Sequence, residues 1–282
     1  MNIHTATHFG MCFGVREALR RAHDAAAAGP VTVLGQLVHN PVVSQHLASL
    51  GVREGRLDDL QSAATPQVII TAHGAADRDR AAWKDAGYRV TDTTCPLVHR
   101  AHTALAELVA RGCQPVVIGQ RCHVEVRGLT GDFPHAAVVE SEDDFPSLPA
   151  APRYGVVSQT TQPISRVRQL VEALRRHCGG AEVIFRDTVC QPTKDRQNAL
   201  DDLCAKCDTL VVIGGRHSNN TRQLADSARA RGVTVHQIET AADLNPVWFR
   251  RCRNAGVTAG TSTLDETVRD VVQRLREISA AA

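Results

Sequence analysis

The stretch "TDTTCPLVHR" (Thr91–Arg100) joins an expected strand to an expected helix at a single cysteine, Cys95. The preceding letters "YRVTD" have the composition and alternation of a strand. Pro96 suits the first turn of a helix because it has no N–H to leave unsatisfied. The helix expected after it carries apolar residues at helical spacing, namely Val98, Ala101, Leu105 and Leu108. A second copy, "RDTVCQPTKDR", covers residues 186–196, so this junction is part of a repeat.

The repeat has three copies. Cys12, Cys95 and Cys190 each precede an amphipathic helix, and each helix leads to an apolar strand that ends in glycine. Those strands are "VTVLG" (31–35), "PVVIG" (115–119) and "LVVIG" (210–214). The glycine follows the cysteine at similar offsets of 23, 24 and 24 residues (35−12, 119−95 and 214−190). Strands that alternate with helices predict parallel sheets covered on both faces.

Each copy then continues into a second buried strand that ends in small polar residues: "VIITAHG" (68–74), "YGVVSQTT" (154–161) and "AGVTAGTS" (255–262). Two copies close with a strand before the next cysteine, and the third has none, so we expect the N-terminal "MNIHTATHFGMC" to supply it. The sequence therefore predicts three similar α/β domains with parallel sheets in a pseudo-threefold arrangement around a central site. The expected boundaries are 12–95, 96–190 and 191–282, the last domain being completed by strand 1–11.

Composition excludes several classes of function. The formal net charge of the 282 residues is +2 and aromatic residues make up 4%, which argues against a nucleic-acid partner. No apolar run approaches 18 residues, and the N-terminus lacks the pattern of a signal peptide. We therefore expect no membrane association and a cytoplasmic location. The odd number of cysteines, nine, argues against a disulfide framework.

Parallel sheets bind ligands at the carboxyl ends of their strands, so Cys12, Cys95 and Cys190 are expected at one central site. A helix N-terminus stabilises a thiolate at each position. The residues alone fit either zinc with an open fourth position or an iron–sulfur cluster with one iron lacking a protein ligand. The other six cysteines are expected to be buried in the core, namely Cys113, Cys122, Cys178, Cys204, Cys207 and Cys252. Cys204 and Cys207 are expected on the apolar face of one helix.

The polar residues at the strand ends indicate an anion pocket for a phosphate or diphosphate. Its expected members are His39, His73, His123, Thr160, Ser218, Asn219, Asn220 and Ser262. Glu125 lies two residues after His123, which on an extended segment places both side chains on one face. Glu125 is therefore the candidate proton donor.

The chain resembles the LytB family, the 4-hydroxy-3-methylbut-2-enyl diphosphate reductases of isoprenoid biosynthesis. The matching fragments follow one another along nearly the whole chain: "GMCFGV", "LVHN", "AHG", "DTTCPLV", "HVEV", "SQTT", "DTVC", "DRQNAL", "HSNNTRQL" and "GVTAGTS". The resemblance implies a 4Fe–4S cluster held by Cys12, Cys95 and Cys190 with one open iron. It also implies that Glu125 donates protons, that Thr160 orients the substrate, and that the histidines, Ser218, Asn220 and Ser262 hold the diphosphate.

The implied reaction is a two-electron reductive dehydroxylation to isopentenyl and dimethylallyl diphosphates plus water, the last step of the methylerythritol phosphate pathway. The resemblance also implies an electron donor like ferredoxin or flavodoxin. The chain departs from the family pattern in three places. Asn219 stands where a serine is usual, Val124 where proline is usual, and "STL" (262–264) replaces a common serine–threonine–proline.

Two other classes of function compete with this interpretation. One is a zinc hydrolase with three cysteine ligands, acting on a phosphorylated substrate. The other is a phosphate-binding module without catalysis. Iron content and colour distinguish the first from the reductase, and the effect of Glu125→Gln on turnover distinguishes the second.

Overall fold

The computed structural model describes residues 1–281, and the chain divides into two compact units. One unit contains Met1–Val15, His39–Val43 and the chain from Gln191 onward, and the other contains Arg16–Val38 and Ser44–Cys190. The first unit contains one four-stranded sheet and the second contains two, and every strand pair in them is parallel. The predicted class, three similar parallel α/β sheets, is confirmed.

The first sheet of the larger unit has the order β3-β2-β4-β5. Its strands are β2 (Thr32–Leu34), β3 (Arg53–Gly55), β4 (Gln67–Ile70) and β5 (Arg89–Asp92), and its helices are α1 (Phe13–Ala28), α2 (Pro41–Ser49) and α3 (Asp77–Asp85). Leu34 and Ile70 pack against Trp83 of α3, whose side chain is fully buried. The Trp83 indole N–H donates to the Leu57 carbonyl (2.9 Å), so the buried ring has no unsatisfied polar atom.

The second sheet of this unit repeats the pattern with the order β7-β6-β8-β9. Its elements are α4 (Pro96–Ala110), β6 (Gln114–Ile118), α5 (Val124–Gly131), β7 (Ala137–Val139), β8 (Arg153–Ser158), α6 (Ile164–His177) and β9 (Glu182–Phe185). Alternate residues of β6 face opposite sides of the sheet. Val116 therefore packs with α6, and Val117 packs with α4 and α5.

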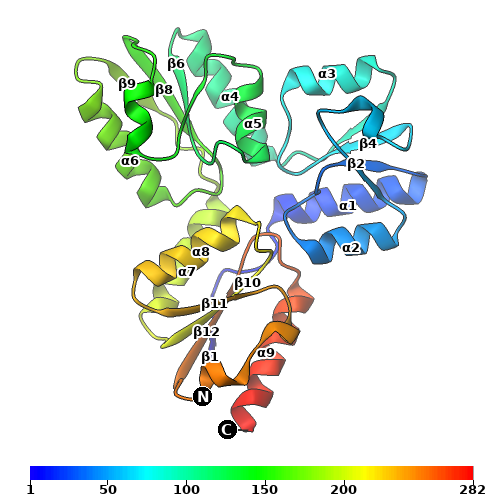
Figure 1. Ribbon diagram of the computed structural model, residues 1–282, viewed down its shortest axis with the longest axis vertical. Helices are drawn as coiled ribbons and strands as arrows, with labels where there is room; N and C mark the ends of the chain where they lie inside the picture. The colour runs from blue at the N-terminus through cyan, green and yellow to red at the C-terminus, as the bar shows by residue number, and fades with distance from the viewer. Residues whose placement is uncertain (282) are drawn as a thin grey trace. The chain divides into compact units, whose positions relative to one another are not determined.

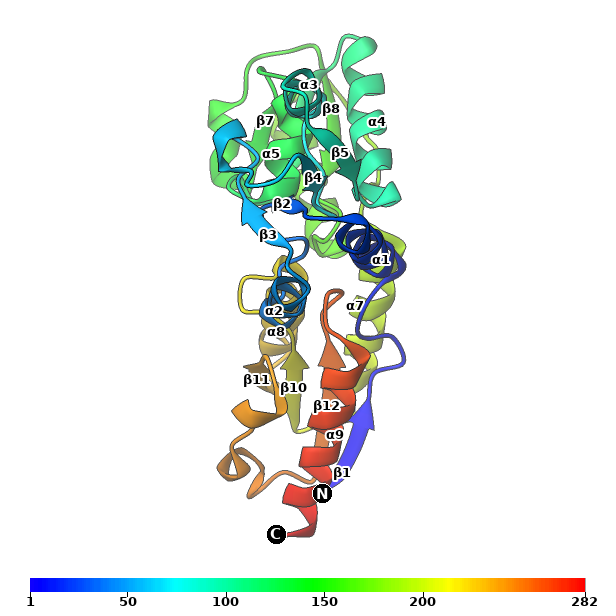
Figure 2. The same cartoon turned by 90° about the vertical axis from the view of Figure 1, so that its right-hand side faces the viewer.

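The sheet of the smaller unit has the order β1-β12-β10-β11. Its elements are β1 (Asn2–Thr5), α7 (Gln191–Cys204), β10 (Thr209–Ile213), α8 (Asn219–Ala230), β11 (Thr234–Ile238), β12 (Asn254–Ala259) and α9 (Asp265–Ala280). Helix α9 covers the face that carries Val211 and Val257, and α7 with α8 covers the face that carries Leu210 and Val212 (Figures 1 and 2). Both faces of this sheet are therefore buried.

The three sheets share one strand order, in which β1 occupies the place of β5 and β9. The closing strand of the last sheet thus comes from the N-terminus, with Asn2 opposite Asn254 and Thr5 opposite Val257. Each sheet falls within one of the expected ranges, and the domain boundaries themselves stay predictions. A short 3-10 helix precedes the second buried strand of each sheet: Leu60–Ser62, Glu142–Ser147 and Ala241–Asp243.

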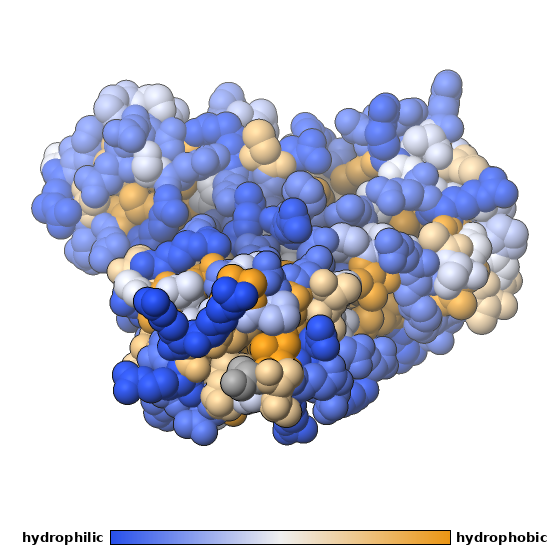
Figure 3. Space-filling model, turned by 60° about the horizontal axis from the view of Figure 1, so that its bottom comes forward, coloured by the Kyte–Doolittle hydropathy of each residue, from blue (hydrophilic) through white to orange (hydrophobic). Residues whose placement is uncertain are grey.

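One end of the smaller unit carries an apolar surface (Figure 3). Met1, Val247, Phe249 and Ile278 are among the residues that line a pocket there. Met1 lies at the amino end of β1, whereas ligands of parallel sheets bind at the carboxyl ends. This pocket is therefore separate from the predicted anion site. Within residues 1–281 no helix has both the length and the apolar character needed to cross a membrane.

Candidate active site

The three predicted ligand cysteines occupy the same place in the three copies of the fold. In each copy the cysteine N–H donates to the carbonyl of the residue two positions beyond a central strand. These bonds join Cys95 to Ala72 (3.1 Å), Cys190 to Thr160 (2.9 Å) and Cys12 to Thr261 (3.0 Å). A helix begins directly after each cysteine, as predicted, and each of the three residues is partly exposed.

Helix α5 approaches the His73 loop closely within the larger unit. A Cβ atom at Gly131 would lie 2.6 Å from the Cβ of Ala76, and one at Gly128 would lie 3.4 Å from the Ala75 backbone. The Asp132 carboxylate at the end of α5 accepts the backbone N–H groups of the first residues of α3, at 2.7 and 3.0 Å. The two glycines and this cap fix α5 against the loop that follows His73.

The same contact brings His73 and His123 together. Their ring centroids are 5.5 Å apart and the rings are nearly perpendicular. His123 is the N-cap of α5, and its Nδ1 accepts the Glu125 N–H at 3.1 Å. In a neutral imidazole the proton then lies on Nε2, which makes that atom a hydrogen-bond donor. The prediction that His123 and Glu125 share an extended segment is wrong, because Glu125 lies in the first turn of a helix capped by His123.

Glu125 is 2% exposed and Thr160 is 4% exposed. The Thr160 N–H donates to Oε1 of Glu125 at 2.6 Å, and the Thr160 hydroxyl also bonds to this carboxylate. Burial raises the Glu125 pKa to about 7, against the opposing effect of the two Thr160 bonds. Because the Thr160 carbonyl accepts the Cys190 N–H, one residue connects the candidate proton donor to a candidate metal ligand.

The smaller unit assembles the other polar residues around Thr261. The Thr261 N–H donates to Oδ1 of Asn220 at 3.0 Å, while its carbonyl accepts from Cys12. The next residue, Ser262, donates through Oγ to the His39 carbonyl at 3.4 Å. Asn40 Nδ2 donates to the Ser262 carbonyl at 2.6 Å. Asn40 was not among the predicted site residues, although it belongs to the fragment "LVHN" that resembles the family.

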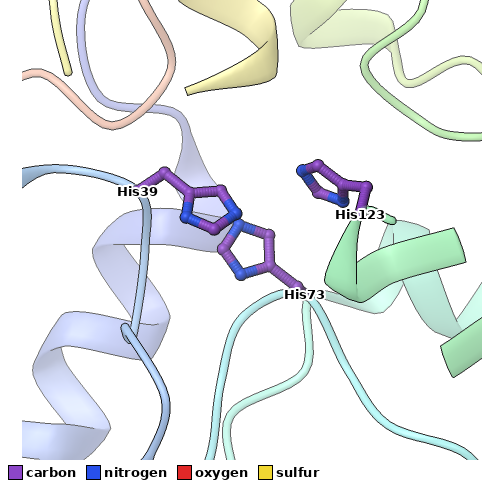
Figure 4. A group of neighbouring side chains, drawn as sticks. All are labelled: His39, His73 and His123. Atoms are coloured by element: carbon purple, nitrogen blue, oxygen red, sulfur yellow. The ribbon is translucent and has the colours of Figure 1, made fainter. Parts of the chain in front are cut away.

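His39 is the first residue of a short segment that belongs to the smaller unit, and it follows Val38 of the larger unit directly. Burial lowers the His39 pKa, and His217 and Arg222 lower it further, so the ring is neutral at pH 7. Figure 4 shows the side chains of His39, His73 and His123, each of which offers one ring nitrogen to a ligand. Neutral imidazoles can donate to an anion or coordinate a metal ion.

Helix α8 begins at the remaining predicted residues. Ser218 is its N-cap and accepts the Thr221 N–H at 3.4 Å. Asn219 and Asn220 form its first turn, and all three residues are buried. A helix N-terminus presents free N–H groups to an anion, so this turn suits a phosphate group. That the residues of the two units meet at one centre stays a prediction.

The other six cysteines do not occupy the place shared by Cys12, Cys95 and Cys190, and two expectations about them are wrong. Cys122 is exposed rather than buried, because it lies in a turn between β6 and α5. Cys207 is buried but is not part of a helix stripe, since α7 ends at Cys204. Cys113 is buried as expected, and Cys178, Cys204 and Cys252 are partly exposed. No disulfide joins any cysteine in the described part of the chain.

The fold and these side chains define an α/β protein of three parallel sheets whose strand ends carry thiols, imidazoles and amide groups. A family model described as "LytB protein" matches residues 3–276. The chain belongs to the LytB family.

Relatives of known name extend this result. A protein of Geobacter metallireducens named 4-hydroxy-3-methylbut-2-enyl diphosphate reductase is 35% identical, and the match covers 100% of this chain and 99% of that protein. One of the same name from Aquifex aeolicus is 33% identical over 99% and 97%. The solved structure of the Plasmodium falciparum E-1-hydroxy-2-methyl-but-2-enyl-4-diphosphate reductase has a TM-score of 0.89 at 26% identity, covering 96% of this chain and 87% of that one.

Proposed function

We propose that this protein is a 4-hydroxy-3-methylbut-2-enyl diphosphate reductase, an oxidoreductase of the methylerythritol phosphate pathway. It converts that substrate to isopentenyl and dimethylallyl diphosphates plus water. The observation that carries the proposal is family membership over the whole chain, from residue 3 to residue 276. The chain of contacts from Glu125 through Thr160 to Cys190 supports it from the structure.

The cofactor proposed is a 4Fe–4S cluster held by Cys12, Cys95 and Cys190. The donor set fits, because these three thiols alone occupy the repeated place before a helix, and all three are partly exposed. Thiolates are the usual protein ligands of such clusters. When bound, the cluster would pass the donor's two electrons to the substrate one at a time and would offer one iron site without a protein ligand.

The diphosphate is proposed to bind to the polar residues of the strand ends. These are His39, His73, His123, Ser218, Asn219, Asn220 and Ser262. His123 would donate through Nε2, because its Nδ1 is occupied by the Glu125 N–H. The buried N-terminus of α8 adds oriented N–H groups without requiring a net positive charge.

Glu125 is the proposed acid. A carboxyl group with a pKa of about 7 is protonated in about half of the molecules at neutral pH, so it can deliver a proton to the leaving hydroxyl as water departs. Thr160 holds the carboxylate with its N–H and hydroxyl and would orient the substrate hydroxyl beside it. The reaction consumes two electrons and two protons, and the oxygen leaves as one water molecule. The electrons would come from a ferredoxin- or flavodoxin-like donor in the cytoplasm.

The test is an anaerobic assay of reconstituted protein with the hydroxylated allylic diphosphate and a reduced one-electron donor. We expect both product diphosphates from the unchanged protein. Cys190→Ser should lose turnover and iron, whereas Cys178→Ser, which alters a partly exposed cysteine at the end of α6, should retain both. A colourless protein that contains one zinc and releases phosphate would contradict the proposal and support a hydrolase.

A further inference from the structure

Arg80 is a buried cation in helix α3. The residue is 9% exposed, and a guanidinium group so deeply buried requires several partners to offset its lost hydration. It has four: Nε donates to Asp92 Oδ2 (2.8 Å), Nη2 to Thr94 Oγ1 (3.1 Å), and Nη1 to both the Ala75 carbonyl and Asp77 Oδ1 (2.9 Å). The reaction described above assigns no role to this residue.

Apart from Asp77 of its own helix, its partners lie in or next to two different loops. Asp92 and Thr94 come just before Cys95, and Ala75 comes two residues after His73. Asp92 Oδ1 accepts both the N–H and the hydroxyl of Thr94, which fixes the turn that leads into the cysteine. The planar guanidinium group can bond to both loops at once because its N–H groups point in fixed, divergent directions.

A second, weaker link joins the same two loops. The Cys95 N–H donates to the Ala72 carbonyl at 3.1 Å, one residue before His73. The Thr93 N–H (3.1 Å) and hydroxyl (2.6 Å) also donate to the Ile70 carbonyl, so these bonds continue the pairing of β4 with β5. Arg80 adds side-chain bonds farther along, to Thr94 and to the Ala75 carbonyl, beyond the last of these backbone bonds.

A similar buried arginine occurs in the smaller unit. Arg196 is 5% exposed and donates to the carbonyls of Pro192 (2.7 Å) and Gly10, two residues before Cys12. The loop of Cys190 is fixed differently, because the Thr188 hydroxyl accepts the Ser158 N–H (2.8 Å) and donates to the Ser158 carbonyl (2.7 Å). Two of the three cysteine loops are thus each held by a buried arginine of their own.

We propose that Arg80 is a positioning residue that holds the Cys95 loop and the His73 loop in a fixed relation. The importance of these two loops rests on the proposed function, in which Cys95 binds the cluster and His73 binds the diphosphate. Without Arg80 the two loops would keep only the bonds to the Ile70 and Ala72 carbonyls, and the segments beyond these bonds would move more freely relative to each other.

The test measures hydrogen exchange at the Cys95 amide in protein without cluster, so it needs neither iron nor turnover. Arg80→Met keeps most of the aliphatic stem and removes the donors. We expect exchange at Cys95 to become at least about tenfold faster, with the Cys190 amide unchanged as an internal reference. Arg80→Lys should give a smaller acceleration, because an ammonium group cannot reproduce the planar bonds.

Two further variants complete the design. Arg78→Met alters an exposed arginine on the same helix and should leave both amides unchanged. Thr94→Val removes one Arg80 partner and should accelerate Cys95 exchange modestly, which keeps the test available if Arg80→Met fails to fold. In loaded enzyme, Arg80→Met should raise the KM for the diphosphate several-fold more than it lowers kcat. Unchanged exchange at Cys95, or equal acceleration at Cys95 and Cys190, would overturn the proposal, whether or not the protein proves to be a reductase.

Discussion

The environment of Glu125 decides when this carboxyl group can hold a proton. It is buried, and its bonds to Thr160 stabilise the charged form less than burial destabilises it. The result is a pKa of about 7, which lets the group both hold and release a proton near neutral pH. A glutamate on the surface would be ionised there and could not donate.

Glu125→Gln should lower kcat by about 10²–10⁴-fold, the usual contribution of a positioned acid. Diphosphate binding should persist, because the amide keeps the size of the side chain and an acceptor for the Thr160 N–H. Steady-state kinetics with a direct binding measurement would check this. Glu142→Gln, at an exposed glutamate, is the matched control. Full activity in Glu125→Gln would remove Glu125 from the mechanism.

The same residue predicts a pH dependence of stability. Below pH 4.5 the carboxyl group is protonated in folded and unfolded chains alike, and between pH 4.5 and 7 the unfolded chain loses the proton first. The contribution of Glu125 to the free energy of unfolding is therefore fully present below pH 4.5 and falls by about 3 kcal/mol as the pH rises to 7. Urea denaturation of wild type and Glu125→Gln across this range should show the difference between them change by that amount. A constant difference would contradict the raised pKa.

The sequence supplied the candidate residues but not the way in which they are held. Glu125 and Thr160 were both candidates, and the structure places them in direct contact. The helix that begins at Val124 was missed because it is short and follows closely after a strand that ends in glycine. Its residues show no clear helical spacing of apolar side chains in the sequence. Arg80 was missed because "DRDRAAWKD" has the composition of an exposed helix, and its burial depends on loops distant in sequence.

Among the elements, α5 depends most clearly on close packing. Its sequence "VEVRGLTG" carries two glycines three positions apart, which lie on one helix face. Ala75 and Ala76 lie against that face. The approach fixes His123 and Glu125 at the beginning of α5 relative to His73.

Gly131→Ala should lower the free energy of unfolding by about 1–3 kcal/mol, because the new methyl group would overlap the Cβ of buried Ala76. Gly128→Ala should cost less or stabilise, since its Cβ meets the Ala75 backbone at an ordinary contact distance and alanine favours a helix. Thermal and urea unfolding would rank the two variants. The double variant Gly131→Ala with Ala76→Gly should recover part of the loss, and no recovery would show that the overlap is not the cause.

The order of helices and strands was predictable because the same order recurs in the three copies of the repeat. Offsets of 23 or 24 residues from cysteine to glycine fixed the helix and strand that follow Cys12, Cys95 and Cys190. The end of α7 was placed too late because Cys207 continues the apolar spacing of Leu200 and Leu203 beyond the last helical residue. An apolar residue that is buried in the turn after a helix cannot be distinguished in the sequence from one that is buried on the face of the helix.

For the whole molecule, the distinctive feature is a sheet assembled from both ends of the chain. Strand β1 pairs with β12, and the N–H groups of Asn2 and Ala6 donate to Arg253 and Val257. Alternation along a strand then directs the His4 N–H toward β12 and the Thr5 N–H away from it. The fold class and this closing strand were predictable, because the last copy of the repeat visibly lacks its own.

His4→Pro should therefore destabilise the sheet by about 1–3 kcal/mol, because it removes a ladder hydrogen bond. Thr5→Pro should cost less, since the N–H that it removes faces away from β12 and its side chain is exposed. Urea unfolding of both variants, with hydrogen exchange in β12, would check the difference. Equal losses would contradict the expected direction of the two N–H groups.

The pairing of Asn2 with Asn254 also determines when the last sheet can be completed during protein synthesis. The partner residues lie 252 positions apart, so β1 leaves the ribosome roughly 13–50 s before β12 is made. Until then the loop that carries Cys12 has no sheet edge to fix it, because its bond to Thr261 cannot exist. A nascent chain can complete the sheets that position Cys95 and Cys190 while the third thiol is still mobile. A group that needs all three thiols in their final positions can therefore be held only after β12 has been made.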